Sequence, residues 1–141
     1  FAEDPATTAE DLGYSTMIMQ PPVIGFVLGL LQDKPGWPDG ERLQQLYDSL
    51  FRHALWFEGP SRDPDSDGLA EYRHSFDSTG DQSPRWDRHK LDPNQVVGPF
   101  RGIEPVDMNL WLSLLWQHLG EMAARLGRSV EACECEARGL A

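Results

Sequence analysis

The 141 residues suffice for one domain with a hydrophobic core, since 40% of them are apolar and 10% are aromatic. The formal net charge of −11 argues against a nucleic-acid ligand, because phosphate binding requires a basic surface. The longest apolar run, residues 17–31, is interrupted by Pro21 and Pro22 and falls short of the roughly 18 apolar residues of a membrane span. We therefore expect no membrane partner.

The chain carries two cysteines, Cys133 and Cys135, in a segment with helical character. Residues two apart on a helix point about 200° from each other, so these thiols should neither form a disulfide readily nor share a metal. Reduced cysteines, together with an acidic start that lacks the features of a signal peptide, favour a cytoplasmic protein. The first residue is Phe1 instead of an initiating Met, which argues against a natural N-terminus.

Two helices are predicted in the first half of the chain. Pro21 and Pro22 suit the first turn of a helix that continues to Leu31, and because its residues are apolar all round we expect it to be buried on all sides. After a Pro- and Gly-rich loop over residues 34–40, Asp39 is expected to cap an amphipathic helix that ends near Phe57. The apolar stripe of this second helix has the spacing of one helix face and consists of Leu43, Leu46, Tyr47, Leu50, Phe51, Ala54 and Leu55.

Two further helices are predicted towards the C-terminus. Pro105 suits the start of a largely buried helix, Gly127 is a natural C-cap for it, and Ser129 begins one more helix. No alternating apolar pattern predicts a strand. The sequence therefore predicts an all-α fold of about four or five helices.

The sequence Asp-Pro-Asp-Ser-Asp-Gly from Asp63 to Gly68 resembles the start of a calcium-binding loop, with Asp63, Asp65 and Asp67 at the ligand positions. The twelfth position is His74 instead of the bidentate Glu that completes an EF-hand. We interpret the segment as a turn with a left-handed Gly68, in which the Asp side chains accept hydrogen bonds from local amides. Calcium binding is the alternative.

The most polar part of the chain, residues 63–87, contains seven carboxylates. Such a segment needs solvent, partners or a ligand, so it is neither a core helix nor an alternating strand. Within it Gly80 permits a sharp turn, Asp81 follows directly, and Ser83-Pro84 has the pattern of an N-cap and a first helical residue. This pattern predicts a functional loop, against the alternative of an Asp-rich connector held by its own arginines.

Three short sequences resemble motifs of glycoside hydrolase family 63 and its trehalase relatives. Residues 74–87 are similar to a signature that reads roughly Glu-Ser-Gly-x-Asp-Asn/Phe-Ser-x-Arg-Trp. Gln20-Pro21-Pro22 looks like the Gln-Pro-Pro that opens an inner helix in this clan, and Pro105–Asn109 is similar to its Val-Asp-Leu-Asn helix start. Within the clan, the chain looks most like the bacterial hydrolases of mannosylglycerate and glucosylglycerate.

The resemblance implies that residues 1–141 are a segment of one (α/α)6 barrel domain, which hydrolyses a small glycoside with inversion and uses two carboxylates. It assigns the general acid to Asp81 and no cofactor. The residues that it implies for substrate binding, or for support of the acid loop, are Gln20, Tyr72, Asp77, Arg85 and Trp86.

The sequence departs from the family pattern at two positions of the signature, since Asp77 replaces the usual Glu and Thr79 stands where the Gly is expected. An (α/α)6 barrel also has twelve helices, more than this chain can form, and the family's catalytic base is a Glu beyond residue 141. We therefore expect the rest of the barrel, or another copy of the chain, to complete the pocket. Two alternatives remain: a non-catalytic helical module that folds with a partner chain, and a trehalase-like disaccharide hydrolase.

Overall fold

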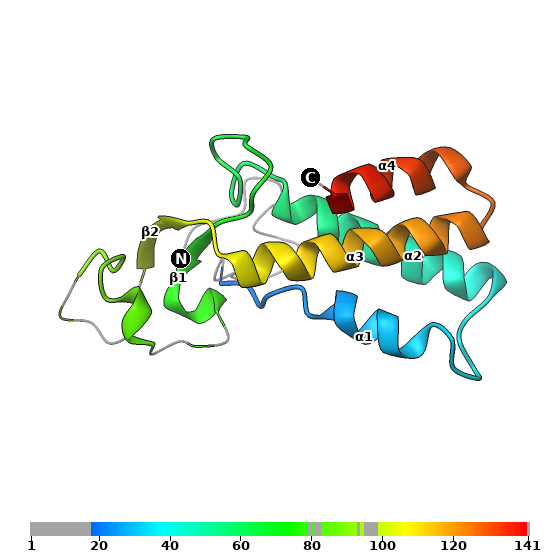
Figure 1. The fold of residues 1–141 in the computed structure, drawn as a ribbon, viewed down its shortest axis with the longest axis horizontal. Coiled ribbons are helices and arrows are strands. Elements are labelled where there is room, and N and C mark those ends of the chain that lie inside the picture. The colour runs from blue at the N-terminus through cyan, green and yellow to red at the C-terminus, as the bar shows by residue number, and fades with distance from the viewer. Residues whose placement is uncertain (1–17, 79, 81–82, 93, 95–98, 141) are drawn as a thin grey trace, which may run out of the picture. The chain divides into compact units, whose positions relative to one another are not determined.

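A computed structural model describes residues 18–78, 80, 83–92, 94 and 99–140 of the chain. The chain divides into two compact units, a loop unit of Phe1–Gln20 and Tyr72–Gly102 and a helical unit of Pro21–Glu71 and Ile103–Ala141. The elements in chain order are α1 (Ile24–Leu31), α2 (Gly40–Phe57), β1 (Tyr72–His74), the 3-10 helices η1 (Ser75–Asp77) and η2 (Pro84–Trp86), β2 (Pro99–Ile103), α3 (Val106–Arg125) and α4 (Ser129–Leu140) (Figure 1). The described chain is mostly helical, as predicted.

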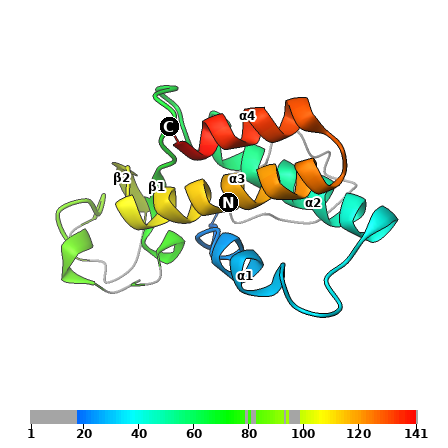
Figure 2. The ribbon, with the colours of Figure 1, turned by 45° about the vertical axis from the view of Figure 1, so that its right-hand side comes forward.

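The helical unit is built around α3, which packs against α1, α2 and α4 (Figures 1 and 2). The prediction that this helix is largely buried is confirmed, although Val106 and Leu110 are exposed. Its buried residues are Met108, Leu112, Leu115, Trp116, Leu119, Gly120, Met122 and Ala123. The ends of the helix also follow the prediction, because Pro105 occupies the N-cap and Gly127, just beyond the C-cap, has a φ of +75°.

Glycines allow the backbones of the neighbouring helices to approach α3 closely. A Cβ atom on Gly25 of α1 would lie only 2.6 Å from the backbone nitrogen of Leu115. On α4, a Cβ atom on Gly139 would lie 3.2 Å from the carbonyl oxygen of Ser113, whose hydroxyl donates a hydrogen bond to the carbonyl of Gly139. A larger side chain at Gly25 would therefore force α1 away from α3, whereas one at Gly139 would require a smaller adjustment of α4.

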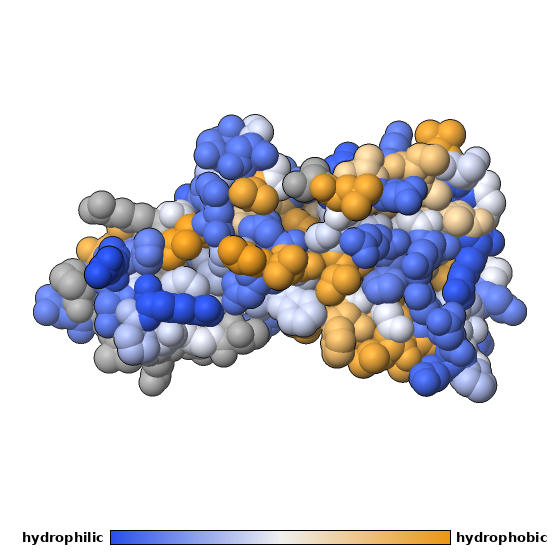
Figure 3. Space-filling view, in the orientation of Figure 1, coloured by the Kyte–Doolittle hydropathy of each residue, from blue (hydrophilic) through white to orange (hydrophobic). Residues whose placement is uncertain are grey.

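The prediction that α1 is buried on all sides is wrong in the described chain. Only one face of the helix packs against α3, where the ring of Phe26 meets the ring of Trp111 edge-on at 5.8 Å between centroids. Exposed apolar side chains of the helix and its N-cap, including the outer part of Phe26, form a patch that is visible over α1 (Figure 3). The members of this patch are 37–54% exposed and comprise Val23, Phe26, Val27, Leu30 and Leu31.

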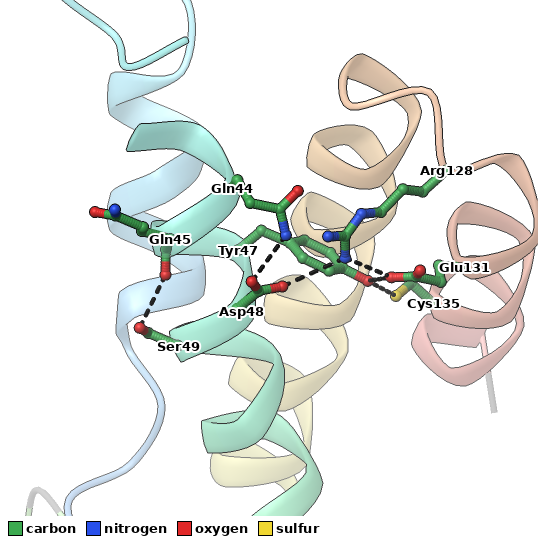
Figure 4. A network of polar contacts seen from close by, with 8 residues as sticks. All are labelled: Gln44, Gln45, Tyr47, Asp48, Ser49, Arg128, Glu131 and Cys135. Carbon is green, nitrogen blue, oxygen red and sulfur yellow. Dashed lines mark hydrogen bonds and ion pairs between the residues drawn. The ribbon is translucent and has the colours of Figure 1, made fainter. Parts of the chain in front are cut away.

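A polar network joins α2 to α4 (Figure 4). The hydroxyl of the buried Tyr47 donates a hydrogen bond to Glu131 at 2.9 Å, and Arg128 bridges Glu131 and Asp48 at 3.0 and 3.3 Å. Burial, followed by the hydrogen bond to Glu131, raises the pKa of Tyr47 above its ordinary value. Asp39 occupies the N-cap of α2, as predicted, but its side chain makes no capping hydrogen bond within the described residues.

The loop unit contains a two-stranded sheet of β1 and β2, which the sequence analysis did not predict. Strands of three and five residues are too short to show an alternating pattern. The predicted helix start at Ser83-Pro84 is confirmed, but the helix is only the single turn of η2.

The two cysteines are both free, as predicted, and differ in exposure. Cys133 is exposed, whereas Cys135 is buried and its burial raises the pKa of its thiol. Within the described residues, no helix is both long enough and apolar enough to cross a bilayer.

Candidate functional site

The predicted general acid, Asp81, lies outside the described residues, as does Gln82, but Gly80 before this pair and Ser83 after it are described and hydrogen-bonded. The backbone N–H of Gly80 donates a hydrogen bond to the hydroxyl of Ser78 at 3.1 Å. The carbonyl of Gly80 accepts two hydrogen bonds, from the backbone N–H of Ser83 and from the indole N–H of Trp86, each at 2.9 Å. The main chain on either side of positions 81 and 82 is therefore braced.

The side chain at the centre of this bracing is Ser78, which the sequence analysis did not single out. Its hydroxyl is almost fully buried, accepts hydrogen bonds from Gly80 and from the indole of Trp86 at 3.1 Å, and donates one to the carbonyl of Ser75 at 3.3 Å. The signal in the sequence was the family signature, in which Ser78 stands at the Ser of Glu-Ser-Gly, but a motif position does not reveal which groups the hydroxyl binds.

Trp86 makes the aromatic contacts that support the loop. Its ring meets that of Tyr72 edge-on, at 5.7 Å between centroids, and the guanidinium of Arg85 stacks on it at 4.0 Å. Trp86 and Tyr72 are 5% and 0% exposed, whereas Arg85 is exposed. Of these three predicted site residues, the guanidinium of Arg85 is thus the group that reaches solvent in the described chain.

The fully buried carboxylate of Asp77 accepts three main-chain hydrogen bonds. One oxygen accepts from the backbone N–H of Met19 at 2.8 Å, and the other from those of Arg73 and His74 at 2.7 and 2.9 Å. Met19 directly precedes Gln20, the exposed residue to which the resemblance assigns sugar binding. Asp77 therefore joins the predicted sugar-binding segment to the predicted acid loop.

The Asp-rich segment forms the turn that we expected. Gly68 has a φ of +93°, and the two oxygens of Asp63 accept hydrogen bonds from the backbone N–H groups of Asp67 and Gly68, each at 3.1 Å. Two sets of carboxylates in this region are close enough to hold a metal ion, namely Asp63, Asp65 and Asp67, and Asp65, Glu71 and Glu104. Repulsion from these neighbours, chiefly from Asp67, raises the pKa of Glu104. Calcium binding at Asp63, Asp65 and Asp67 stays the alternative to a turn without metal.

The Val-Asp-Met-Asn sequence at the start of α3 has a clear structural role in its last residue. The side-chain amide of Asn109 accepts a hydrogen bond from the backbone N–H of Ala70 at 2.9 Å and donates to the carbonyls of Ala70 and Pro105, each at 3.0 Å. Asn109 thus pairs with Ala70 as a neighbouring strand would and anchors the Asp-rich turn to α3.

The family model of the mannosylglycerate hydrolase MGH1-like glycoside hydrolase domain matches residues 2–139, almost the whole chain. A mostly helical chain that matches this model is part of the all-α catalytic domain of a glycoside hydrolase. Within that class, the chain belongs to the MGH1-like family, which confirms the resemblance drawn from the three short motifs. No curated protein and no solved structure matches the chain.

Proposed function

We propose that this chain supplies the general acid, Asp81, of an inverting α-glycosidase that hydrolyses a small glycoside such as glucosylglycerate or mannosylglycerate. The observation that carries the proposal is the bracing of the loop on both sides of Asp81 in a chain that belongs to a glycoside hydrolase family. A braced loop can present an acid in one orientation, and fixed orientation is a large part of enzymatic rate acceleration.

The proposed chemistry needs two carboxyl groups about 6.5–9.5 Å apart, so that a water molecule fits between the second group and the sugar. Asp81, in its protonated form, would donate a proton to the leaving oxygen. The base would deprotonate the attacking water, and we assign it to a Glu outside residues 1–141. We infer that the rest of the barrel, or another copy of the chain, supplies that base and the remaining walls of the pocket.

The other predicted site residues receive complementary roles. Gln20 is exposed, so its amide is available to hydrogen-bond a sugar hydroxyl, and Arg85 is likewise exposed and available for a substrate contact. The buried side chains of Tyr72 and Trp86 would support the acid loop by packing. We also infer a cytoplasmic location from the two free cysteines.

The test is the substitution Asp81→Asn in the complete enzyme, assayed with glucosylglycerate, mannosylglycerate and trehalose. We expect kcat to fall by about 10²–10⁴-fold or more, as is typical for the loss of an acid catalyst, with an unchanged melting temperature. Asp92→Asn is a matched control, because it makes the same change of side chain at a residue whose partner in the described chain is Asn94, two residues away. Turnover at the wild-type rate by Asp81→Asn would rule out the proposed role.

The substrate preference separates the remaining alternatives. Hydrolysis of trehalose alone would favour the trehalase-like interpretation, and NMR of the freshly released sugar would report inversion or retention at the anomeric carbon. The exposed apolar patch of α1 favours association with further protein, as a helical module would require. A folded complete protein that hydrolyses none of the three substrates would support that non-catalytic alternative.

A further inference from the structure

Two adjacent side chains of the loop unit, Asp77 and Ser78, are both almost completely buried and both bind the main chain. Asp77 is 0% exposed and Ser78 is 2% exposed. Burying a carboxylate is costly unless several donors replace the water that it loses. Three backbone N–H groups do so for Asp77, so its burial serves to organise the chain around it.

The hydrogen bonds of Asp77 and Ser78 connect to two different segments of the chain. Asp77 reaches back 58 positions to the backbone N–H of Met19 and holds the segment that continues into Gln20. Ser78 reaches forward to the backbone N–H of Gly80 and the indole N–H of Trp86, and so holds the segment that continues into Asp81. The two predicted site segments, distant in sequence, thus have their anchors on consecutive residues.

We propose that Asp77 and Ser78 are a positioning pair that sets the placement of the sugar-binding segment at Gln20 relative to the acid loop at Asp81. This inference rests on the proposed function. Asp77, which the resemblance groups with the substrate-binding residues, acts on the substrate through Met19 and Gln20, because its carboxylate has no exposed surface in the described chain.

The local geometry adds a second reason for the role of Asp77. The imidazole of His74 accepts a hydrogen bond from the backbone N–H of Phe76 at 3.1 Å, while Asp77 accepts from the backbone N–H of His74. This reciprocal capping fixes the single turn of η1, so the Asp77 carboxylate is attached to a well-defined backbone. A rigid anchor is what a positioning residue requires, since a displacement of about 1 Å at a reacting group can reduce the rate a hundredfold.

The two members of the pair should have different kinetic signatures. Asp77→Asn keeps the size of the side chain but leaves one oxygen to serve donors from two segments, so the hold on Met19 is weakened. We expect KM to rise by about tenfold and kcat to fall by a smaller factor, because the sugar-binding segment is released first. Ser78→Ala frees Gly80 and the indole of Trp86, and we expect kcat to fall by about tenfold with little change in KM.

The experiment measures kcat and KM in the complete enzyme, well below the melting temperature of every variant. Asp92→Asn is the matched control for Asp77→Asn. Leu119→Ala, which opens a cavity in the helical unit, is a control for lost stability alone, because Leu119 is fully buried in α3. Asp77→Glu, which keeps the carboxylate, and Ser78→Thr, which keeps the hydroxyl, should restore part of the lost activity. Should Asp77→Asn fail to fold, Ser78→Ala and its Thr counterpart carry the test.

The kinetic pattern decides between positioning and stability. A fall in kcat/KM confined to Asp77→Asn and Ser78→Ala, split between KM and kcat as described and partly restored in Asp77→Glu and Ser78→Thr, supports the pair. Equal effects in Leu119→Ala, or wild-type kinetics in both loop variants, would overturn it. The result is separable from the test of Asp81: an inactive Asp81→Asn beside fully active Asp77→Asn and Ser78→Ala refutes the pair and leaves the proposed function standing. An active Asp81→Asn refutes the proposed function itself.

Discussion

The two units of this chain are stabilised in different ways. In the helical unit, α1 and α4 lie against α3 through apolar side chains and through glycines that bring backbones together. In the loop unit, short elements are held by the buried polar side chains of Asp77 and Ser78, which bind five backbone or indole donors between them. The first kind of contact distributes its energy over many atoms, whereas the second depends on a few individual oxygens.

This difference separates stability from activity. An apolar core loses free energy roughly in proportion to the atoms removed and can relax around a change. A buried hydrogen-bond network has directional contacts, so the loss of one acceptor changes the position of the chain that it held. We therefore expect substitutions in the helical unit to change stability most, and those in the loop unit to change activity most.

The largest loss of stability is expected for Gly25→Ala in the complete protein. The added Cβ would lie 2.6 Å from the backbone nitrogen and 2.9 Å from the Cα of Leu115, and backbone atoms cannot move aside individually. We expect a loss of about 3 kcal/mol in the free energy of unfolding, measured by denaturant titration. Gly29→Ala is the control, because the three atoms nearest to its Cβ belong to the movable side chain of His118, the first at 2.8 Å. Equal losses in the two variants would contradict the close backbone contact.

A substitution in the loop unit should instead reduce activity more than stability. Trp86→Phe keeps an aromatic ring against Tyr72 but removes the indole N–H that binds Ser78 and the carbonyl of Gly80. We expect about 1 kcal/mol of lost stability but a fall of about tenfold or more in kcat, because the loop before Asp81 loses a support. Comparison of melting temperature and kcat in one preparation checks this. A variant that loses stability but keeps full kcat would erase the distinction between the two units.

Alkaline pH provides a test within the helical unit. Burial raises the pKa of Tyr47 above its ordinary value of 10.0, so above about pH 10 the folded protein retains a proton that the unfolded chain releases. The contribution of this pKa shift to the free energy of unfolding is complete below about pH 10 and is lost as the pH rises further. Tyr47→Phe should cost about 1 kcal/mol at neutral pH, through the lost hydrogen bond to Glu131, and should lose less stability above pH 10 than the wild type. Parallel pH profiles for the two proteins would be the contrary result.

The smallest effect is expected at the Asp-rich turn. Asp63→Asn removes one of two acceptors for local amides and should cost about 0.5–1 kcal/mol. Because the carboxylate already serves Asp67 and Gly68, we expect the melting temperature to be the same with added calcium and with a chelator. A calcium-dependent rise that Asp63→Asn abolishes would instead support the metal site.

The helices could be predicted from the sequence because their signals are local. Pro105, Gly127 and Ser129 each act on the helix end where they stand. The exposed face of α1 could not be predicted from the sequence. A helix that is apolar all round is expected to be buried, but its own residues do not show whether the described part of the chain buries it.

The candidate loop was located by Gly80 and by the Ser83-Pro84 helix start, yet its internal organisation was not. The hydrogen bond between Met19 and Asp77 spans 58 positions and depends on tertiary geometry that no local pattern records. The role of Ser78 was missed for a related reason, because its partners become apparent only when the indole of Trp86 turns back onto the loop. The sequence thus indicates where a site lies, and the fold decides which of its residues brace it.

Because the two cysteines of α4 differ in exposure, their reactivity can report how α4 is packed against α3. Cys133 can be alkylated in the native state, whereas Cys135 lies against Gly120 with a raised pKa and is protected from a maleimide. Reaction at Cys135 therefore requires α4 to separate from α3. The ratio of the two alkylation rates, followed by peptide mass spectrometry, would report how often this helix opens, without the introduction of a foreign label site.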